Sequence, residues 1–182
     1  MKEKLVYIAS SEKDDYLQII KSIKRNMNPA RNTVLIVDDE KGIRMKIARE
    51  VKAFDPSMVI FEATNGAEAL ETLDFIRTTY VLDPLLIVLD LNMPVMDGWE
   101  VINRLKDEYE NKGKNAGIPI LVLSSTSGEK NSLLSKNSVH EGKSGYTPLV
   151  SIAKETCMDK SHYDAVGEKG LLAWLEFFMN KK

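Results

Sequence analysis

Four short runs of apolar residues alternate along the chain with longer stretches in which apolar residues recur every three or four positions. The short runs are rich in Val, Ile and Leu and cover residues 34–37, 58–61, 85–89 and 118–123. Runs of this length without polar alternation predict strands that are buried on both faces. The helical spacing between them predicts amphipathic helices. The chain is therefore expected to form a doubly wound α/β fold with a parallel sheet and helices on both faces.

Three helices are expected between these strands, and Asn65 is the predicted N-cap of the second. Their apolar positions are Ile43, Ile47, Val51 and Phe54; Ala67, Leu70, Leu73 and Ile76; and Val101, Ile102 and Leu105.

The pattern after residue 123 is less regular. Residues 124–148 are rich in Ser, Gly, Lys and Asn and predict a long loop. The stretch "LVSIAKETCM", residues 149–158, has apolar residues at helical spacing and is predicted to be a helix. "SHYDAV", residues 161–166, is the predicted last strand. A final helix follows, with an apolar stripe that is expected to be core: Leu171, Leu172, Trp174, Leu175 and Phe178.

The N-terminal segment resembles the first predicted strand and helix. "LVYIASSEKDDYLQIIKSIK" aligns without gaps, at an offset of 28, with "TVLIVDDEKGIRMKIAREVK", and places Ser10 and Ser11 where Asp38 and Asp39 stand. A partial repeat and a chance similarity between two amphipathic segments explain this equally well. In both cases residues 5–8 can pair with a sheet edge of the same chain or of a neighbour. We expect a strand–helix extension over 1–31 and one domain over 32–182.

Composition limits the classes of function. Hydrophobic residues make up 43% and charged residues 29% of the 182 residues, which is typical of a globular protein. The net charge of −2 predicts no direct nucleic-acid partner. Absence of any apolar run near the roughly 18 residues of a membrane span predicts no membrane insertion. One cysteine, Cys157, excludes an internal disulfide and suits the cytoplasm, where we expect the protein.

Carboxylates follow two of the predicted strands. Asp38 and Asp39 end the first and Asp90 ends the third. In a parallel sheet such residues gather at the carboxyl edge, so the three are expected to share one pocket. Adjacent like charges are tolerated when a cation joins them, and Mg²⁺ prefers oxygen ligands. A carboxylate beside Mg²⁺ can act as a nucleophile toward phosphorus, and a hydroxyl at Ser124 could bond an anionic oxygen there.

The segments "VLIVDDE", "LLIVLDLNMPVMDGWEVINRLK" and "IPILVLSS" resemble the receiver domain of two-component response regulators over residues 33–125. The resemblance implies a flavodoxin-like, five-stranded parallel sheet. It also implies roles for individual residues. Asp90 would be the phosphoacceptor, Asp38, Asp39 and the backbone carbonyl of Asn92 would bind Mg²⁺ together with Asp90, and Ser124 would contact the phosphoryl group.

The C-terminal half departs from the family pattern, in which the last strand ends with an aromatic residue, two further residues, and Lys-Pro. "HYDAVGEK" offers Tyr163 as the aromatic residue but Val166 and Gly167 in place of Lys-Pro. An alternative, "SGYTPLV", offers Tyr146 and Pro148, also without a lysine at the right step. The first placement is preferred because the terminal apolar helix then follows it. Residues 127–147 become an insertion, and the missing charge is expected from Lys143 or Lys169.

Three functions are compatible with these residues. The first is a receiver that accepts a phosphoryl group on Asp90 from a histidine kinase or histidine phosphotransfer protein, depends on Mg²⁺, and acts by binding an unidentified downstream protein. It would not be an enzyme, except that it could catalyse its own phosphorylation and dephosphorylation. Formation of a homodimer is possible. The second is a phosphorylation-independent pseudo-receiver that serves as an interaction or assembly module. The third, an aspartate-based phosphatase, ranks last because Asn92 stands where a second aspartate is needed.

Overall fold

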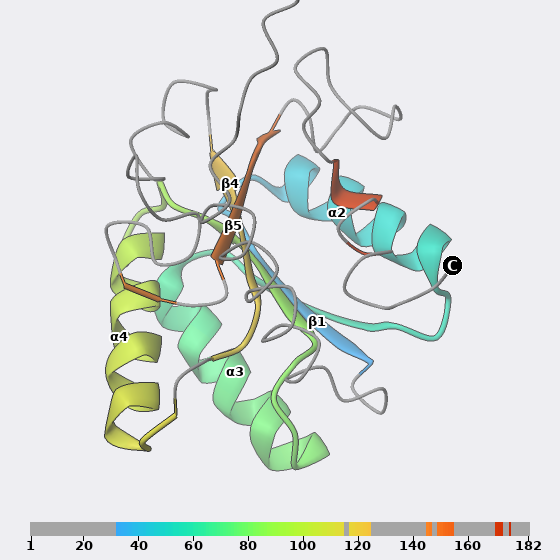
Figure 1. Ribbon diagram of the computed structural model, residues 1–182. Helices are drawn as coiled ribbons and strands as arrows, with labels where there is room; N and C mark the ends of the chain where they lie inside the picture. Colours follow the sequence, from blue (N-terminus) through green and yellow to red (C-terminus); the bar gives the residue numbers. More distant parts are fainter. Residues whose placement is uncertain are drawn as a thin grey trace, which may run out of the picture.

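A five-stranded parallel sheet forms the centre of the protein (Figure 1). The computed structural model describes residues 32–114, 117–124, 145–146, 149–154, 170–172 and 175. The strands are β1 (Thr33–Val37), β2 (Val59–Ala63), β3 (Leu86–Asp90), β4 (Ile120–Ser124) and β5 (Leu149–Ala153). Their order across the sheet is β2-β1-β3-β4-β5, and all neighbouring pairs are parallel. The predicted flavodoxin-like α/β class is confirmed.

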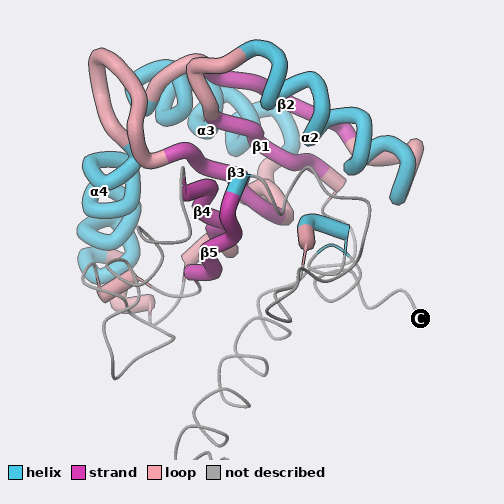
Figure 2. The backbone as a smooth tube through the Cα atoms, turned by 90° about the horizontal axis from the view of Figure 1, so that it is seen from above, coloured by secondary structure: helices cyan, strands magenta, loops and turns pink. Residues whose placement is uncertain are grey.

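Helices cover both faces of the sheet. They are α2 (Lys41–Phe54), α3 (Gly66–Tyr80) and α4 (Gly98–Asn111). Seen from above, α3 and α4 lie on one face and α2 on the other (Figure 2). The Asn65 side chain accepts a hydrogen bond from the Glu68 N–H, so the predicted N-cap of α3 is confirmed. None of the described helices is long and apolar enough to cross a membrane.

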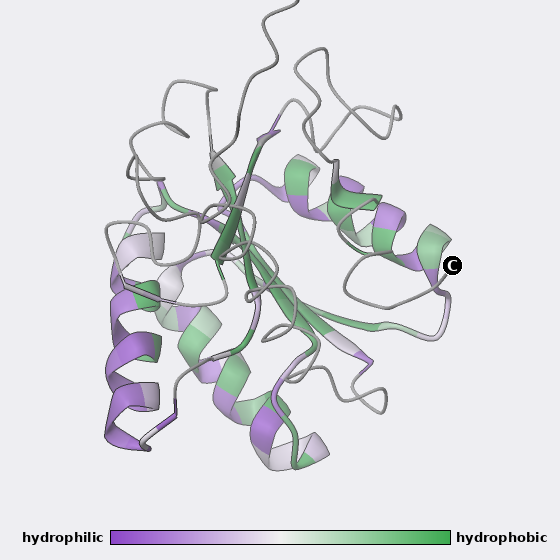
Figure 3. Ribbon diagram, in the orientation of Figure 1, coloured by the Kyte–Doolittle hydropathy of each residue, from purple (hydrophilic) through white to green (hydrophobic). Residues whose placement is uncertain are grey.

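Burial explains why β1 and β3 could be predicted. All residues of β1 and β3 are buried, because these strands lie inside the sheet with helices on both sides. The apolar side chains form one cluster under α3 and α4 and a second under α2, where Leu171 and Leu175 also pack. Figure 3 shows the apolar strands between helices whose outer faces are polar. The predicted core role of the C-terminal apolar stripe is thus confirmed at two of its positions.

The fifth strand corrects the sequence-based prediction. Residues 149–153 were expected in a helix, but they form β5, which pairs in register with β4 from Ile120↔Leu149 to Ser124↔Ala153. Leu149 packs in the cluster under α4, whereas Ile152 packs in the cluster under α2. Side chains three residues apart lie on opposite faces of a strand but on the same face of a helix. Residues 161–166, the predicted last strand, lie outside the described residues.

Tyr146 ties the end of the predicted 127–147 insertion to the fold. Gly145 and Tyr146 are the described residues of that segment. The Tyr146 ring is 2% exposed and packs edge-on against Tyr109 of α4, and its hydroxyl donates a hydrogen bond to the Ile118 carbonyl at 2.7 Å. Gly117 permits this packing, because a Cβ there would overlap both tyrosine side chains.

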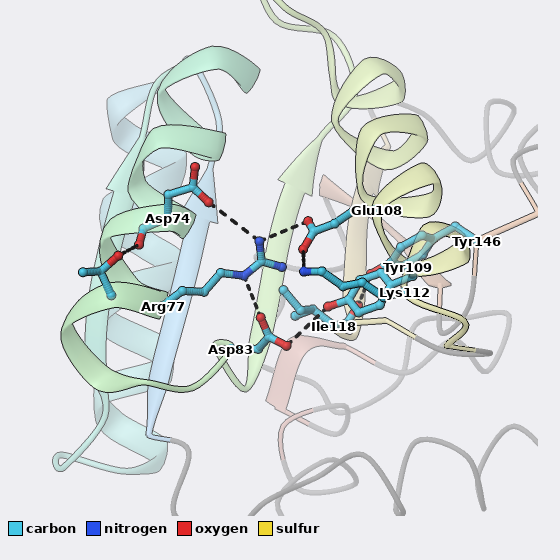
Figure 4. A network of polar contacts seen from close by, with 9 residues as sticks. Asp74, Arg77, Asp83, Glu108, Tyr109, Lys112, Ile118 and Tyr146 are labelled. Carbon is cyan, nitrogen blue, oxygen red and sulfur yellow. Dashed lines mark hydrogen bonds and ion pairs between the residues drawn. The ribbon is translucent and has the colours of Figure 1, made fainter.

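Arg77 links α3 to α4 through ion pairs with Asp83, which precedes β3, and with Glu108 of α4 (Figure 4). Its guanidinium lies 2.7 Å from Asp83 and 3.0 Å from Glu108, and Lys112 pairs with the same glutamate. Burial alone would raise the pKa of Glu108, but the hydrogen bonds from Lys112 and Arg77 outweigh it and lower that pKa. The network therefore fixes the position of the two helices relative to each other.

Candidate functional site

Three carboxylates meet at the carboxyl edge of the sheet, as predicted. β1 and β3 are neighbours, so Asp38, which follows β1, stands beside Asp90, the last residue of β3. One oxygen atom of each of Asp38, Asp39 and Asp90 lies within 4.8 Å of the others. Asp38 is 0% and Asp90 1% exposed, whereas Asp39 is exposed to solvent. The cluster thus has two buried acids and one at the surface.

Lys154 supplies the positive charge of this site. It follows β5 directly, and its Nζ atom lies 3.0 Å from Asp38 Oδ2, 3.0 Å from Asp90 Oδ2 and 3.2 Å from Glu40 Oε1. Burial alone would lower the pKa of Lys154, but the Asp90 and Asp38 carboxylates outweigh it and hold that pKa above its usual value. The side chain is therefore a cation at neutral pH.

The prediction that the family lysine is missing is wrong. Lys154 directly follows β5, the last strand of the described part of the chain, at the step where the family pattern has its lysine. Sequence reasoning missed it because residues 149–158 were assigned to a helix. The signal that could have found it is a five-residue run followed by Lys, "LVSIAK", after a long loop. Lys143 and Lys169, which were expected to supply the missing charge, and Tyr163, the expected aromatic residue, lie outside the described residues.

With Lys154 in place, the departure from the family pattern lies elsewhere. Ser151 occupies the position of the aromatic residue, three before the lysine, and Glu155 occupies the position of the proline. The Ser151 hydroxyl is buried and has no hydrogen-bond partner among the described residues. The chain therefore keeps the cation of the site and replaces the aromatic ring of the last strand by a small polar side chain.

Asp38 is held from several directions. Its Oδ1 accepts a hydrogen bond from the Glu40 N–H at 2.8 Å, and its backbone carbonyl accepts one from Arg44 Nη1 at 2.7 Å. Arg44, which is nearly buried, also pairs with Glu62 of β2 at 2.9 Å. The sequence analysis did not identify Arg44. The feature that could have identified it is a cationic residue among the apolar positions of α2. Burial raises the pKa of Asp38, which Glu40 and Lys154 only partly offset.

The turn after Asp90 brings α4 against the site. Gly98, the first residue of α4, donates its N–H to the Leu91 carbonyl at 3.0 Å, and a Cβ at Gly98 would overlap the Asp90 carbonyl oxygen. Asp97 caps the helix by accepting a hydrogen bond from the Glu100 N–H. The "MDG" sequence thus combines a cap with a close backbone approach. The Asn92 N–H donates to Asp90 Oδ1 at 3.4 Å, while the role of its carbonyl as a metal ligand stays a prediction.

Ser124 is the last residue of β4 and pairs with Ala153, next to Lys154. It therefore lies at the same edge of the sheet as the carboxylates, as predicted, although its side chain lies outside the described part of the chain.

The donor atoms suit a hard divalent cation. All three clustered side chains offer carboxylate oxygens, the ligands that Mg²⁺ prefers. Asp38 Oδ2 is buried and, apart from its ion pair with Lys154, accepts no hydrogen bond within the described residues. Lys154 lies 3.0 Å from this oxygen, so a metal ion bound there would share the oxygen with the lysine or displace the lysine. Asp38, Asp39 and Asp90 are therefore the residues that would hold Mg²⁺.

The chain is similar to curated proteins of known family. The nitrate/nitrite response regulator protein NarL of Escherichia coli K12 is 30% identical over 143 residues, which are 79% of this chain and 58% of NarL. A protein-glutamate methylesterase/protein-glutamine glutaminase of Halalkalibacterium halodurans is 38% identical over 101 residues, 55% of this chain and 25% of that protein. The chain thus spans little more than half of NarL and a quarter of the methylesterase.

A solved structure shares the fold. The response regulator receiver domain protein from Clostridium thermocellum superposes with a TM-score of 0.51 at 15% identity, over 81% of this chain and 94% of that one. The family model for the response regulator receiver domain matches residues 34–138, more than half of the sequence. With the acidic cluster and Lys154 at the sheet edge, this match shows that the protein belongs to the response regulator receiver domain family.

Proposed function

We propose that Asp90 accepts a phosphoryl group from a phosphohistidine of a histidine kinase or histidine phosphotransfer protein, and that Mg²⁺ is needed for the transfer. One observation carries this proposal: Asp90 is a buried carboxylate at a strand end, beside two further aspartates and a charged lysine. The chemistry follows from general rules of phosphoryl transfer, in which positioning and charge compensation supply most of the catalysis.

The transfer balances with the groups at hand. A carboxylate oxygen of Asp90 attacks phosphorus, the P–O bond forms as the P–N bond to the donor histidine breaks, and the released imidazole takes a proton from water. Lys154 lies 3.0 Å from the attacking carboxylate and would offset the charge that gathers on the phosphoryl oxygens. Bound Mg²⁺ would supply further compensation for the same charge.

The output is proposed to be binding of another protein. A phosphoryl group on Asp90 would attract Lys154 away from Asp38 and Glu40, which it contacts here. Such a change of partners gives the two states different stabilities, which a switch requires. NarL is a response regulator by name, which supports a regulatory role. Cytoplasmic action is part of the same proposal.

Intact mass spectrometry tests the proposal. The full chain is incubated with acetyl phosphate, with and without Mg²⁺, beside Asp90→Asn and a matched exposed-acid control, Asp107→Asn on α4. One phosphoryl adduct that requires Mg²⁺, persists in Asp107→Asn and is lost in Asp90→Asn is expected. An adduct that persists in Asp90→Asn would refute the assignment of the phosphoacceptor.

Ser151 favours one alternative, a phosphorylation-independent interaction module. A small hydroxyl in β5 stands where the family pattern has an aromatic ring. The chain therefore lacks the side chain that would couple phosphorylation to a change at the surface. The same experiment separates the two functions, because a folded chain that binds Mg²⁺ and yields no adduct would favour the alternative.

A further inference from the structure

The outer edge of β2 carries backbone groups that pair with no strand among the described residues. β2 is the first strand in the sheet order and pairs only with β1 there. The Val59 N–H donates to the Asn32 carbonyl, and the Ala63 carbonyl accepts from the Asp38 N–H. Since successive residues direct their backbone groups to opposite sides, the N–H groups of Ile60 and Glu62 point outward. An open edge of this kind is a template for another strand.

An exposed aromatic patch, formed by Phe61, Phe75 and Tyr80, adjoins this edge. The Phe61 ring on β2 meets the rings of Phe75 and Tyr80 on α3 edge to face, each with centroids 6.0 Å apart. Phe75 is nevertheless 57% and Tyr80 37% exposed. Arg77, on the other side of α3, pairs with α4. α3 therefore has a helix beside it on one side and exposed aromatic rings on the other.

The handedness of crossover connections determines on which face of the sheet a strand–helix unit ahead of β1 would lie. The connection from β2 to β3 runs through α3 and passes over β1. A strand outside β2 that connects to β1 would cross the sheet in the same direction and pass over β2. Crossovers between parallel strands are almost always right-handed, so its helix would lie on the same face as α3. That place is the free side of α3, over the aromatic patch.

The chain itself contains a matching unit. Residues 1–31 lie outside the described residues, and their sequence aligns with β1 and α2 at an offset of 28. In this alignment Ile19 and Ile23 correspond to Ile47 and Val51, which are fully buried residues of α2. The chain enters the described fold at Asn32, whose carbonyl and side-chain amide bond the Val59 N–H and the Ser57 carbonyl at the start of β2.

From these observations we infer that residues 5–8 add a sixth parallel strand to the outer edge of β2, and that the following amphipathic helix covers the aromatic patch. This strand would then be the first in the order of the sheet. The partial sequence repeat would correspond to a repeated strand–helix unit in the fold. The inference is independent of phosphorylation at Asp90.

Amide hydrogen exchange, followed by NMR on the full chain, tests the strand. The expected result is slow exchange at Ile60 and Glu62 that becomes at least tenfold faster in Val6→Pro, because proline removes a backbone donor and interrupts pairing. Glu3→Pro, placed ahead of the strand, should leave both rates unchanged. Unprotected amides at Ile60 and Glu62 in the wild type, or equal rates in wild type and Val6→Pro, would overturn the inference.

Tryptic cleavage of the full chain after Lys21, Lys24 and Arg25 tests the helix. Phe75→Glu puts a charge under the proposed helix and should speed cleavage severalfold. Met45→Glu is the matched control, because Met45 is 51% exposed on α2, on the opposite face, and its replacement should leave the rate unchanged. Equal rates in all three proteins would refute the helix position. Protection that rises with protein concentration, with a dimer in sedimentation, would assign the strand to a second copy and overturn the intramolecular inference.

Discussion

Val95 shows at the scale of one residue how the turn after Asp90 stores strain. It is a β-branched residue with a φ of 71° and is 87% exposed, so no burial offsets its left-handed conformation. Val95→Gly is expected to stabilise the protein by about 1 kcal/mol, since glycine adopts this conformation freely. Urea unfolding should show a higher midpoint at an unchanged slope. Val95→Ala keeps the Cβ clash, and a gain as large as that of glycine would contradict the explanation.

Replacement of Lys154 should lower the stability of the fold in a way that depends on pH. Lys154→Met leaves the buried carboxylates of Asp38 and Asp90 without their cation, which is expected to cost about 3 kcal/mol at pH 7 without Mg²⁺. The pKa of Asp38 is already raised by burial and loses one of the groups that lower it. An acid with a raised pKa destabilises the fold as pH rises, so the deficit should shrink toward pH 4.

Chemical denaturation of the wild type, Lys154→Met and Lys154→Arg between pH 4 and 8 measures this effect. Lys154→Arg keeps the charge and should recover most of the stability at pH 7. A deficit in Lys154→Met that is the same at pH 4 and pH 8 would indicate lost packing and not lost charge.

Gly98 connects a helix to the site at the scale of elements. Gly98→Ala would press a Cβ into the Asp90 backbone, so α4 or the strand end must shift, and a loss of about 2 kcal/mol is expected. Gly42→Ala is the matched control, because Gly42 lies in α2 with nothing within 4 Å of the added Cβ and should gain up to about 1 kcal/mol. Thermal unfolding compares the two, and a shift of the same sign in both would contradict the close approach.

The Arg77 network makes the packing of α3 against α4 sensitive to acid. The pKa of Glu108 is lowered in the folded protein, so its contribution is present above the unfolded pKa of about 4.3 and is lost as pH falls through the folded value. Glu108→Gln should therefore cost about 1 kcal/mol at pH 7 and less at pH 3. Glu110→Gln, whose pair with Lys106 is exposed, should have no measurable effect at either pH.

Element by element, predictability followed burial. Strands β1, β3 and β4 consist of uninterrupted apolar residues apart from their ends. This composition predicts a buried strand and no other element. β5 contains Ser151, and its Leu149, Ile152 and Ala153 have a spacing that fits a helix as well as a strand. Pairing with β4 decides between them, and a single segment contains no information on that pairing. The error in β5 then moved the expected position of the lysine.

At the scale of the whole molecule, the carboxylate cluster was predictable and its cationic partners were not. Asp38 and Asp90 end strands that the sequence identifies, and parallel strands bring such ends to one edge. Lys154 and Arg44 come to the site from elements that follow or cover the sheet, so their positions depend on how β5 and α2 pack. Sequence motifs thus predict those site residues that the ends of predictable strands position. They do not predict site residues whose positions depend on how other elements pack.

Stability of the whole fold should depend on Mg²⁺ if the cluster binds it. A ligand that binds only the folded state, at 100 times its Kd, adds about 2.7 kcal/mol, which for a domain of this size raises Tm by roughly 5–10 °C. Asp39→Asn is the informative variant, because Asp39 belongs to the cluster but is exposed, so its replacement should not disturb the core. Calorimetry with and without Mg²⁺ should show the shift in the wild type and Asp107→Asn and lose most of it in Asp39→Asn. An equal shift in all three proteins would place the ion elsewhere and leave the buried Asp38 oxygen to Lys154 alone.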